Sequence, residues 1–376
     1  MRPGPALCAA ALAALGPAEG LLTREPGLRA VVFSCPARQA SANAGDWKPQ
    51  SLWVGFRASA RLLRSLGCEL PIYNLLDEDE FAAAASPCRD LAEGPDPINN
   101  TQCLKMARTG TSGYGYTKIY AIRDAPADQV LFFDCDAFPV ADPTLLFNST
   151  DFLRTGALFW PDIEGHFLSD GHWKAAHHLF PTDRRGLLRE WWAQQGLDTG
   201  LLLVDKVAWA RPLSVLLDMV EGASGQGVDW GFQDLDALSS GDKDLWHLAW
   251  LLAGEPCREG ACSLAPCAAV AGAWQGDRLL MTGQAKLGPG GELLALHQIW
   301  RTGEDRRPVP AELLARLRLP GRRSVAGNND LLHGFGSGSI SRTELEQQLS
   351  EGDLQPLPAG VAELVARVAR EWEEGA

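Results

Sequence analysis

The stretch that decides the fold is Val130-Leu-Phe-Phe-Asp-Cys-Asp-Ala-Phe-Pro139. It begins with a charge-free apolar run of strand length, which is typical of a strand buried on both faces of a parallel sheet. Side chains alternate along a strand, so Asp134 and Asp136 are expected to point one way and Cys135 the other. In open α/β sheets the ligand site lies at the carboxyl ends of strands, where these carboxylates fall.

Two adjacent carboxylates at the edge of an apolar core repel each other. Either one of them takes a proton or a cation lies between them. Mg²⁺ and Mn²⁺ prefer such oxygen ligands, and they commonly bind through one or two carboxylates plus substrate phosphates. The stretch therefore predicts a metal and diphosphate site. The alternative is that Asp134 and Asp136 only begin a turn into Pro139, because Asp-x-Asp alone is a common pattern.

Length and charge limit the possible functions. The chain has 376 residues, enough for one large α/β domain or for such a domain with an appendage. Its formal net charge of −13 argues against nucleic acid and anionic membrane surfaces as partners. A nucleotide remains compatible with this charge, since a bound metal offsets a diphosphate locally.

The N-terminus has the pattern of a secretory leader. A basic start is followed by a short apolar stretch from Ala6 to Leu15 and then by small residues, which predicts a signal peptide or short leader over residues 1–20. A disordered Ala-rich leader is the alternative. The apolar stretch is too short to span a bilayer, so membrane association is expected at most through this leader.

Glycosylation acceptors and cysteines fit a lumenal chain. Asn99-Asn-Thr101 and Asn148-Ser-Thr150 have the acceptor pattern, so a glycoprotein is expected. Cys88 and Cys103 are spaced for a short-loop disulfide, as are two of the three cysteines between 257 and 267. A zinc site is the alternative for that last group, although it lacks Cys-x-x-Cys spacing and a nearby His.

The chain opens with a strand-helix-strand pattern. The predicted strand Leu28–Cys35 is followed by a helix over Ser51–Leu66, which ends at a glycine, and by a strand over Glu69–Tyr73. This is how a nucleotide-binding sheet begins. The segment Phe81–Cys103 carries three prolines and is expected to be irregular.

Further strands and helices are expected after this opening. Strands are predicted over Thr155–Trp160 and Leu197–Lys206, and helices over 113–124, 207–220, 245–253 and 361–372. Asp242 stands at the N-cap of the third of these helices. A Gly-Pro-Gly-Gly sequence at 288–291 predicts a hairpin, with His297 at the end of its second strand.

Taken together, these motifs resemble the Golgi α-mannosyltransferases of the fungal cell-wall type, glycosyltransferase family 71. The similarity runs from about Arg29 to Arg301 as six motifs in order: Leu66–Tyr73 with Asp77-Glu78, Lys118 with Val130–Phe147, Thr155–Asp162, Asp198–Lys206, Gly241–Asp244 and Leu294–His297. Three departures bear on donor and acceptor preference: Ala137 replaces an Asn, Asp198 replaces a Glu, and Gln298 replaces the Arg that usually follows the histidine.

The resemblance implies the fold and the domains. It implies an α/β chain with the GT-A nucleotide-diphospho-sugar transferase fold, a Rossmann-like mixed sheet flanked by helices. The catalytic domain would cover residues 28–300, and a C-terminal helical or loop extension would cover 301–376.

The resemblance also implies the site. Asp134, Asp136 and His297 would hold Mn²⁺ or Mg²⁺, and Lys118 would help to bind the donor phosphate. Three further acids, Asp162, Asp198 and Asp242, would face the donor sugar or the acceptor. For each of these three acids the alternative is a turn or cap role.

The implied activity is metal-dependent transfer of a hexose with retention. The donor would be GDP-mannose or a UDP-sugar, the acceptor a glycan or glycoprotein, and the compartment the secretory pathway, with the Golgi lumen favoured. The alternatives are a UDP-sugar-dependent galactosyl-, glucosyl- or xylosyltransferase of the same fold, a secreted carbohydrate-binding protein without catalysis, and a metal-dependent phosphohydrolase. The acids and His297 are all present, which argues against a binding protein without catalysis. A phosphohydrolase would need more clustered metal ligands.

Overall fold

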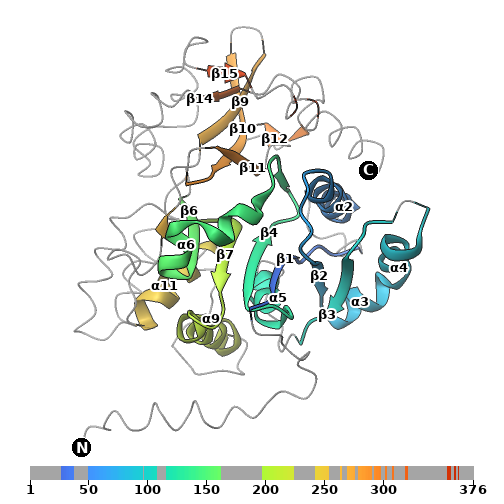
Figure 1. Cartoon of the computed structure of the whole chain (residues 1–376), viewed down its shortest axis with the longest axis vertical. Helices are drawn as coiled ribbons and strands as arrows, with labels where there is room; N and C mark the ends of the chain where they lie inside the picture. Colours follow the sequence, from blue (N-terminus) through green and yellow to red (C-terminus); the bar gives the residue numbers. More distant parts are fainter. Residues whose placement is uncertain are drawn as a thin grey trace, which may run out of the picture.

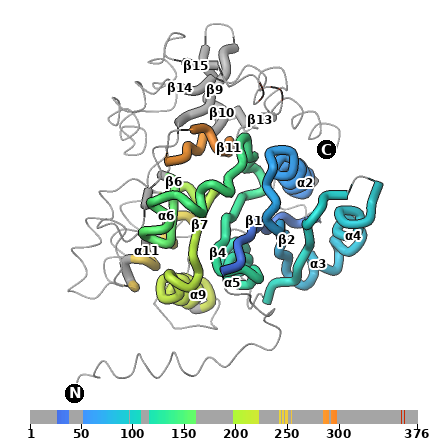
Figure 2. Tube along the Cα trace, viewed as in Figure 1, coloured from blue at the N-terminus to red at the C-terminus, as the bar shows by residue number. Residues whose placement is uncertain are grey.

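The structure is a computed structural model, and it describes residues 27–37, 50–95, 97–107, 116–161, 197–223 and 242–253, with short stretches between 263 and 363. Within these residues, helices cover a larger sheet, and a smaller sheet lies beyond one of its ends (Figure 1). Strand β4 (Gln129–Phe133) runs through the centre of the described part (Figure 2).

The larger sheet has seven strands in the order β3-β2-β1-β4-β7-β6-β8. Strand β1 is parallel to β2 and to β4, β2 is parallel to β3, β7 is antiparallel to β4 and to β6, and β8 is parallel to β6. The bounds besides those of β4 are β1 (Arg29–Phe33), β2 (Ile72–Leu76), β3 (Thr101–Lys105), β6 (Ala157–Pro161), β7 (Leu197–Asp205) and β8 (Ser263–Leu264). The predicted fold class, a Rossmann-like mixed sheet with flanking helices, is confirmed.

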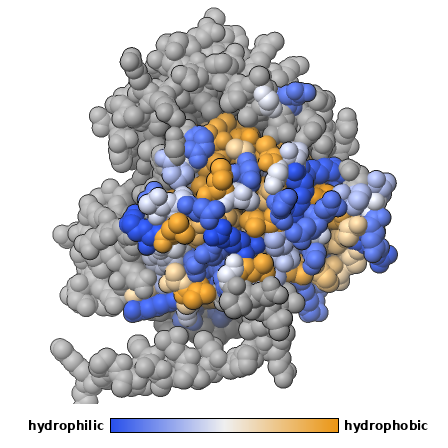
Figure 3. Space-filling view, in the orientation of Figure 1, coloured by the Kyte–Doolittle hydropathy of each residue, from blue (hydrophilic) through white to orange (hydrophobic). Residues whose placement is uncertain are grey.

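The described helices are short or medium in length. They are α2 (Gln50–Ser65), α3 (Glu78–Ala83), α4 (Ala85–Glu93), α5 (Thr117–Asp124), the 3₁₀ helix η2 (Pro143–Asn148), α6 (Thr150–Thr155), α9 (Ala210–Ala223) and α11 (Lys243–Ala253). Hydrophilic residues cover much of the α2–α4 side of the face in Figure 3, and apolar residues gather beside β11 (Leu293–His297).

Strand β4 is buried on both of its faces, as its unbroken apolar run predicts. Val130 and Phe132 belong to a core cluster that includes side chains of α5, α9 and α11. Leu131 and Phe133 belong to a second cluster that includes Phe56 of α2. The carboxyl end of β4 is therefore fixed from both sides, which makes it a rigid base for a site.

The smaller sheet has six strands in the order β15-β14-β9-β10-β11-β5. The bounds besides those of β11 are β5 (Ala137–Pro139), β9 (Ala269–Gln275), β10 (Arg278–Leu287), β14 (Arg318–Pro320) and β15 (Leu354–Pro356), and a separate ribbon pairs β12 (Arg301–Thr302) with β13 (Arg307–Pro308). The predicted hairpin is confirmed as β10 and β11, which pair antiparallel. Because β5 follows β4 after three residues, the Asp134–Asp136 turn connects the two sheets.

Two expectations for the first third of the chain are wrong. The second strand begins at Ile72 and not at Glu69, since Pro71 has no N–H and the ladder bond comes from the Ile72 amide to Asn100. The segment Phe81–Cys103 is not irregular but carries the second half of α3, the whole of α4 and the start of β3. Its Pro87 lies in the first turn of α4, where no amide donor is needed.

Two disulfides are present among the described residues. Cys88–Cys103, which the sequence predicts, ties α4 to β3. Cys35–Cys135 is a finding of the structure, and it joins the residues that follow the parallel neighbours β1 and β4. The cysteines between 257 and 267, the predicted leader over 1–20 and, apart from Glu363, the predicted helix over 361–372 lie outside the described residues. No helix in the described part is both long enough and apolar enough to cross a membrane.

Removing the Cys88–Cys103 bond tests this part of the fold. The bond closes a loop of 15 residues, so the double variant Cys88→Ser/Cys103→Ser should lose about 3 kcal/mol of unfolding free energy. Urea unfolding without reductant, followed by circular dichroism, measures the loss. The control is the single variant Cys68→Ser, which removes a buried thiol without opening a loop. An unchanged midpoint in the double variant would show that the two cysteines are not joined.

Candidate active site

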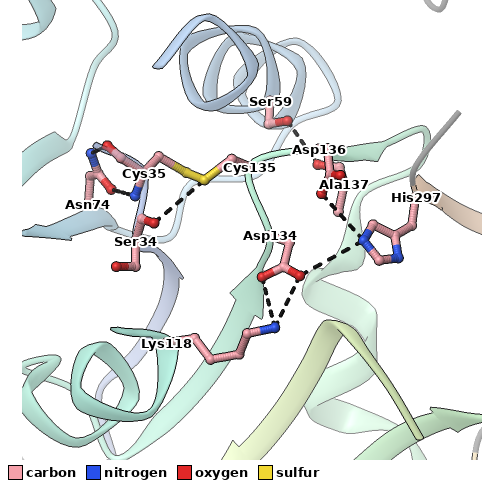
Figure 4. Close-up of a disulfide and its surroundings, with 10 residues drawn as sticks. All are labelled: Ser34, Cys35, Ser59, Asn74, Lys118, Asp134, Cys135, Asp136, Ala137 and His297. Atoms are coloured by element: carbon pink, nitrogen blue, oxygen red, sulfur yellow. Dashed lines mark hydrogen bonds and ion pairs between the residues drawn. A yellow bond between two sulfur atoms is a disulfide. The ribbon is translucent and has the colours of Figure 1, made fainter. Parts of the chain in front are cut away.

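The Asp-x-Asp stretch forms a turn and not the end of a strand. Strand β4 ends at Phe133, and the turn closes through a hydrogen bond from the Ala137 amide to the Asp134 carbonyl, 3.0 Å long. The expectation that these three residues continue the strand with alternating side chains is therefore wrong. Its consequence still holds, because Cys135 points back to Cys35 while the two carboxylates point elsewhere (Figure 4).

Pairing between β5 and β11 brings a distant histidine to this turn. His297 lies opposite Ala137 in the antiparallel register of the two strands. Its Nε2 atom lies 3.3 Å from Oδ1 of Asp136 and 3.8 Å from Oδ2 of Asp134 (Figure 4). One ligand atom from each of the three residues lies within 4.8 Å of the others. The structure thus brings together the predicted trio in a geometry that suits one cation.

The second ring nitrogen of His297, Nδ1, contacts Asp198 and so orients the ring. Nδ1 lies 3.0 Å from Oδ2 of Asp198, so the Nδ1–H donates to that carboxylate. Nε2 is buried and makes no hydrogen bond to any described residue, although the two turn carboxylates lie near it. Metal-bound histidines commonly donate their second ring nitrogen to a carboxylate in this way. The donor set therefore fits a divalent cation.

Gly200 leaves the space that the imidazole of His297 occupies. A Cβ atom built on Gly200 would lie 2.3 Å from Cε1 and 2.4 Å from Nδ1 of His297. Real Cβ atoms do not approach other atoms this closely, so any side chain at position 200 would displace the ring. The Gly in the Asp198-Thr-Gly200 motif is thus explained by packing against His297.

Lys118 lies between two of the predicted acids. Its Nζ lies 3.0 Å from Oδ1 of Asp134 and 3.3 Å from Oδ1 of Asp242. It also donates to the carbonyl and the hydroxyl of Thr199, each at 3.0 Å. Burial lowers the pKa of Lys118, but Asp134 and Asp242 outweigh burial and raise it above its usual range. Lys118 therefore stays charged and holds these two acids in place.

The charges of the site, which are buried or partly buried, do not balance. Two ammonium groups, Lys118 and Lys286, face four carboxylates, which are Asp134, Asp136, Asp198 and Asp242. With all six groups ionised and His297 neutral, two negative charges remain. Buried charges need partners, so the site favours a divalent cation.

The pKa values show the same imbalance. Burial raises the pKa of Asp134 to about 6, although Lys118 and His297 oppose the rise. Burial lowers the pKa of His297, but Asp198 and Asp136 more than offset it and raise it to about 10. Without a cation the imidazole therefore keeps a proton at neutral pH. A bound ion would take the place of that proton.

The remaining predicted acids differ in what the structure describes. Asp242 directly precedes α11, at the cap position that the sequence predicts, and its Oδ2 accepts a hydrogen bond of 2.8 Å from the Trp246 indole. Asp198 is buried and engaged with His297. Asp162 lies outside the described residues.

Sequence reasoning did not single out three contributors. Thr199 connects Lys118 with Asp242, Lys286 pairs with Asp198, and the Ser59 hydroxyl of α2 donates to the Ala137 carbonyl beside the turn at 2.9 Å. Lys286 lies close before the glycine-rich turn at 288–291, where a lysine gives no signal of burial. The roles of Thr199 and Ser59 depend on tertiary contacts that no local pattern reveals.

Comparison with known proteins now gives the class of the chain. A family model matches residues 54–258, which is more than half of the sequence, and places the chain among the glycosyltransferases. The chain belongs to the family described as "Mannosyltransferase putative". No curated protein sequence matches it.

Several solved structures are similar at low identity. The glycosyltransferase GlyE of Streptococcus pneumoniae TIGR4 is 16% identical, with a TM-score of 0.35 over 59% of this chain and 43% of that one. The galactosyltransferase LgtC, solved with donor and acceptor sugar analogs, is 16% identical, with a TM-score of 0.38 over 63% and 73%. Mouse xyloside xylosyltransferase 1 is 15% identical, with a TM-score of 0.38 over 65% and 86%. The match therefore spans less than half of the GlyE chain.

The contact between Gly200 and His297 gives a test of the site. Gly200→Ala should displace the imidazole and weaken Mn²⁺ binding by about tenfold or more, while the sheets remain folded. Electron paramagnetic resonance of free Mn²⁺ measures the affinity in the purified protein. The matched control is Gly67→Ala, where nothing lies within 4 Å of the added methyl but φ is +93°, so stability alone should fall. Unchanged Mn²⁺ affinity in Gly200→Ala would contradict the ring position.

Proposed function

We propose that this protein transfers a hexose, mannose in the first instance, from a sugar nucleotide to a glycan or glycoprotein acceptor. Membership of the mannosyltransferase family supports the reaction class. The observation that carries the proposal is the partly buried cluster of Asp134, Asp136 and His297, which has an excess of negative charge and an oriented histidine.

In this proposal the trio binds a divalent ion, and the chain's residues orient it. Asp134 and Asp136 supply oxygen ligands, and His297 supplies Nε2. When bound, the ion stabilises the negative charge on the departing diphosphate. An imidazole is a better ligand for Mn²⁺ than for Mg²⁺, so the trio favours Mn²⁺. The side chain of Asp134 is 28% exposed, so the ligand group is open on the side where a diphosphate would approach.

Lys118 and Asp242 have a defined geometry for a role beside the ion. Lys118 contacts both oxygens of Asp134, at 3.0 and 3.1 Å, which fixes that ligand. Asp242 is held by Lys118 on one oxygen and by the Trp246 indole on the other. In the proposal, Asp162 faces the donor sugar or the acceptor, these contacts keep Asp242 beside the ion, and transfer proceeds with retention. Positioned groups of this kind contribute to rate mainly by fixing the reacting geometry.

A second candidate is a transferase of the same fold that uses a UDP-sugar. The departures at Ala137 and Gln298 from the mannosyltransferase motifs favour keeping this candidate. Both candidates use the same ion and acids. They differ only in the donor, so a panel of GDP- and UDP-sugars with Mn²⁺ distinguishes them by the nucleotide that is released.

Asp136→Asn tests the reaction in that assay. A neutral amide removes one ligand charge without changing the shape of the side chain, and transfer should fall by about 100-fold or more, since even outer partners of a metal ligand cost 10–100-fold. Asp151→Asn is the control, because Asp151 has the same charge and pairs with Arg154 on the surface of α6. Transfer by Asp136→Asn at the rate of the control would falsify the proposed role of the cluster.

We also propose that the chain is lumenal and glycosylated. Asn99 and Asn148 are both exposed, as an acceptor must be. Expression in a secretory host should therefore give a product whose mass falls on treatment with an endoglycosidase. Asn99→Gln and Asn148→Gln should each remove one increment of the shift, and the double variant should remove it all. A product without any shift would contradict the lumenal assignment.

A further inference from the structure

Both oxygens of Asp198 are engaged inside the protein. Its Oδ1 accepts from the Gly200 amide at 2.8 Å and lies 2.9 Å from Nζ of Lys286. Its Oδ2 accepts from Nδ1 of His297 at 3.0 Å. The residue is 4% exposed. Both oxygens thus point into the protein, toward the support of the ring and away from any substrate.

Lys286 is the counter-charge of this acid. Its side chain is 0% exposed, and it lies on β10, where it also donates to Oε1 of Gln284 at 2.7 Å. Gln284 is the direct partner of His297 across the hairpin, so Gln284, Lys286 and His297 share one face of the smaller sheet. The hairpin therefore carries both the candidate metal ligand His297 and the Lys286 ammonium, which fixes Asp198 behind the ring.

We propose that Lys286 and Asp198 are positioning residues for His297: the ammonium holds the carboxylate, and the carboxylate holds the imidazole with Nε2 directed at a divalent cation. The inference rests on the proposed function, because it assumes that the trio binds an ion. It gives Asp198 a role different from the sugar contact that the family resemblance implies. It also assigns a role to Lys286, which no motif of the sequence indicates.

Direct Mn²⁺ binding tests the proposal without relying on catalysis. In Lys286→Met the buried carboxylate loses its partner, and Mn²⁺ affinity should fall 10–100-fold, the range found for outer partners of metal ligands. The ¹⁴N coupling in pulsed electron paramagnetic resonance, which reports a histidine nitrogen bound to Mn²⁺, should weaken in parallel. His297→Gln gives the reference spectrum without that coupling. The control is Lys105→Met, which removes a surface lysine paired with Glu78 and should leave both readouts unchanged.

A double variant separates positioning from stability. Replacing both members of a buried ion pair by neutral groups is often neutral for stability, so Asp198→Asn/Lys286→Met should unfold near the wild-type temperature. An amide has only one accepting oxygen and cannot serve both the Gly200 amide and Nδ1 of His297. The double variant should therefore remain folded and still bind Mn²⁺ at least tenfold more weakly, with reduced ¹⁴N coupling.

The outcomes distinguish this inference from the proposed function. If the wild-type protein binds Mn²⁺ with ¹⁴N coupling and the folded double variant does so equally well, the positioning role is wrong and the metal site stands. If the wild-type protein itself shows no Mn²⁺ binding, the proposed function is wrong and this inference falls with it. If Lys286→Met does not fold, the double variant still decides whether the positioning role is right.

Discussion

The excess of negative charge at the end of β4, where the carboxylates are buried or partly buried, is the constraint on which the rest of the structure depends. Four carboxylates converge there with two ammonium groups, and the histidine between them keeps a raised pKa as long as no cation is present. Such a cluster destabilises a fold unless every member is held by partners. Each ammonium accordingly contacts acids of the site, with Lys118 joining Asp134 to Asp242 and Lys286 serving Asp198. The arrangement is understandable as a site that keeps its charges ordered for an ion.

The two sheets meet at this cluster. The larger sheet supplies the turn after β4 and the Asp198-Thr-Gly200 segment at the start of β7, which lie side by side because β4 and β7 are antiparallel. The smaller sheet supplies His297 and Lys286 from one hairpin. Strand β5 makes the connection, since it leaves the turn directly and pairs with β11. The candidate ligands and their supports thus come from three separate segments of the chain, which strand pairing brings together.

Much of this could be predicted from the sequence, because the signals were local. The apolar run from Val130 to Phe133 indicated a doubly buried strand, and the glycine-rich turn at 288–291 indicated the hairpin that ends in His297. The family motifs, taken in order, indicated that this histidine returns to the acids. The helices α3 and α4 could not be predicted from a segment with three prolines, although Pro87 lies in a first turn, where it costs no hydrogen bond.

The residues that support the candidate ligands could not be predicted from the sequence, for a physical reason. Lys286, Thr199 and Gly200 act through atoms that touch only after the sheets pair, and periodicity carries no information about such contacts. Gly200 is the clearest case, because its φ angle does not require glycine and only the His297 ring packed on its Cα explains it. The same limit applies to Asp198, for which the sequence allowed a substrate contact or a turn role.

The Cys35–Cys135 disulfide also holds the charged Asp134–Asp136 turn rigid. It joins the residues that follow β1 and β4, the two parallel strands at which the strand order of the larger sheet reverses, and this is where ligands bind in open α/β sheets. Cys135 stands between Asp134 and Asp136, so the bond anchors the turn from behind while Ser59 of α2 holds the next carbonyl. The two acids repel each other, and a free turn would let them separate. Covalent and hydrogen-bonded anchoring on the far side of the turn opposes that separation, which explains why a cysteine occupies the middle position of the motif.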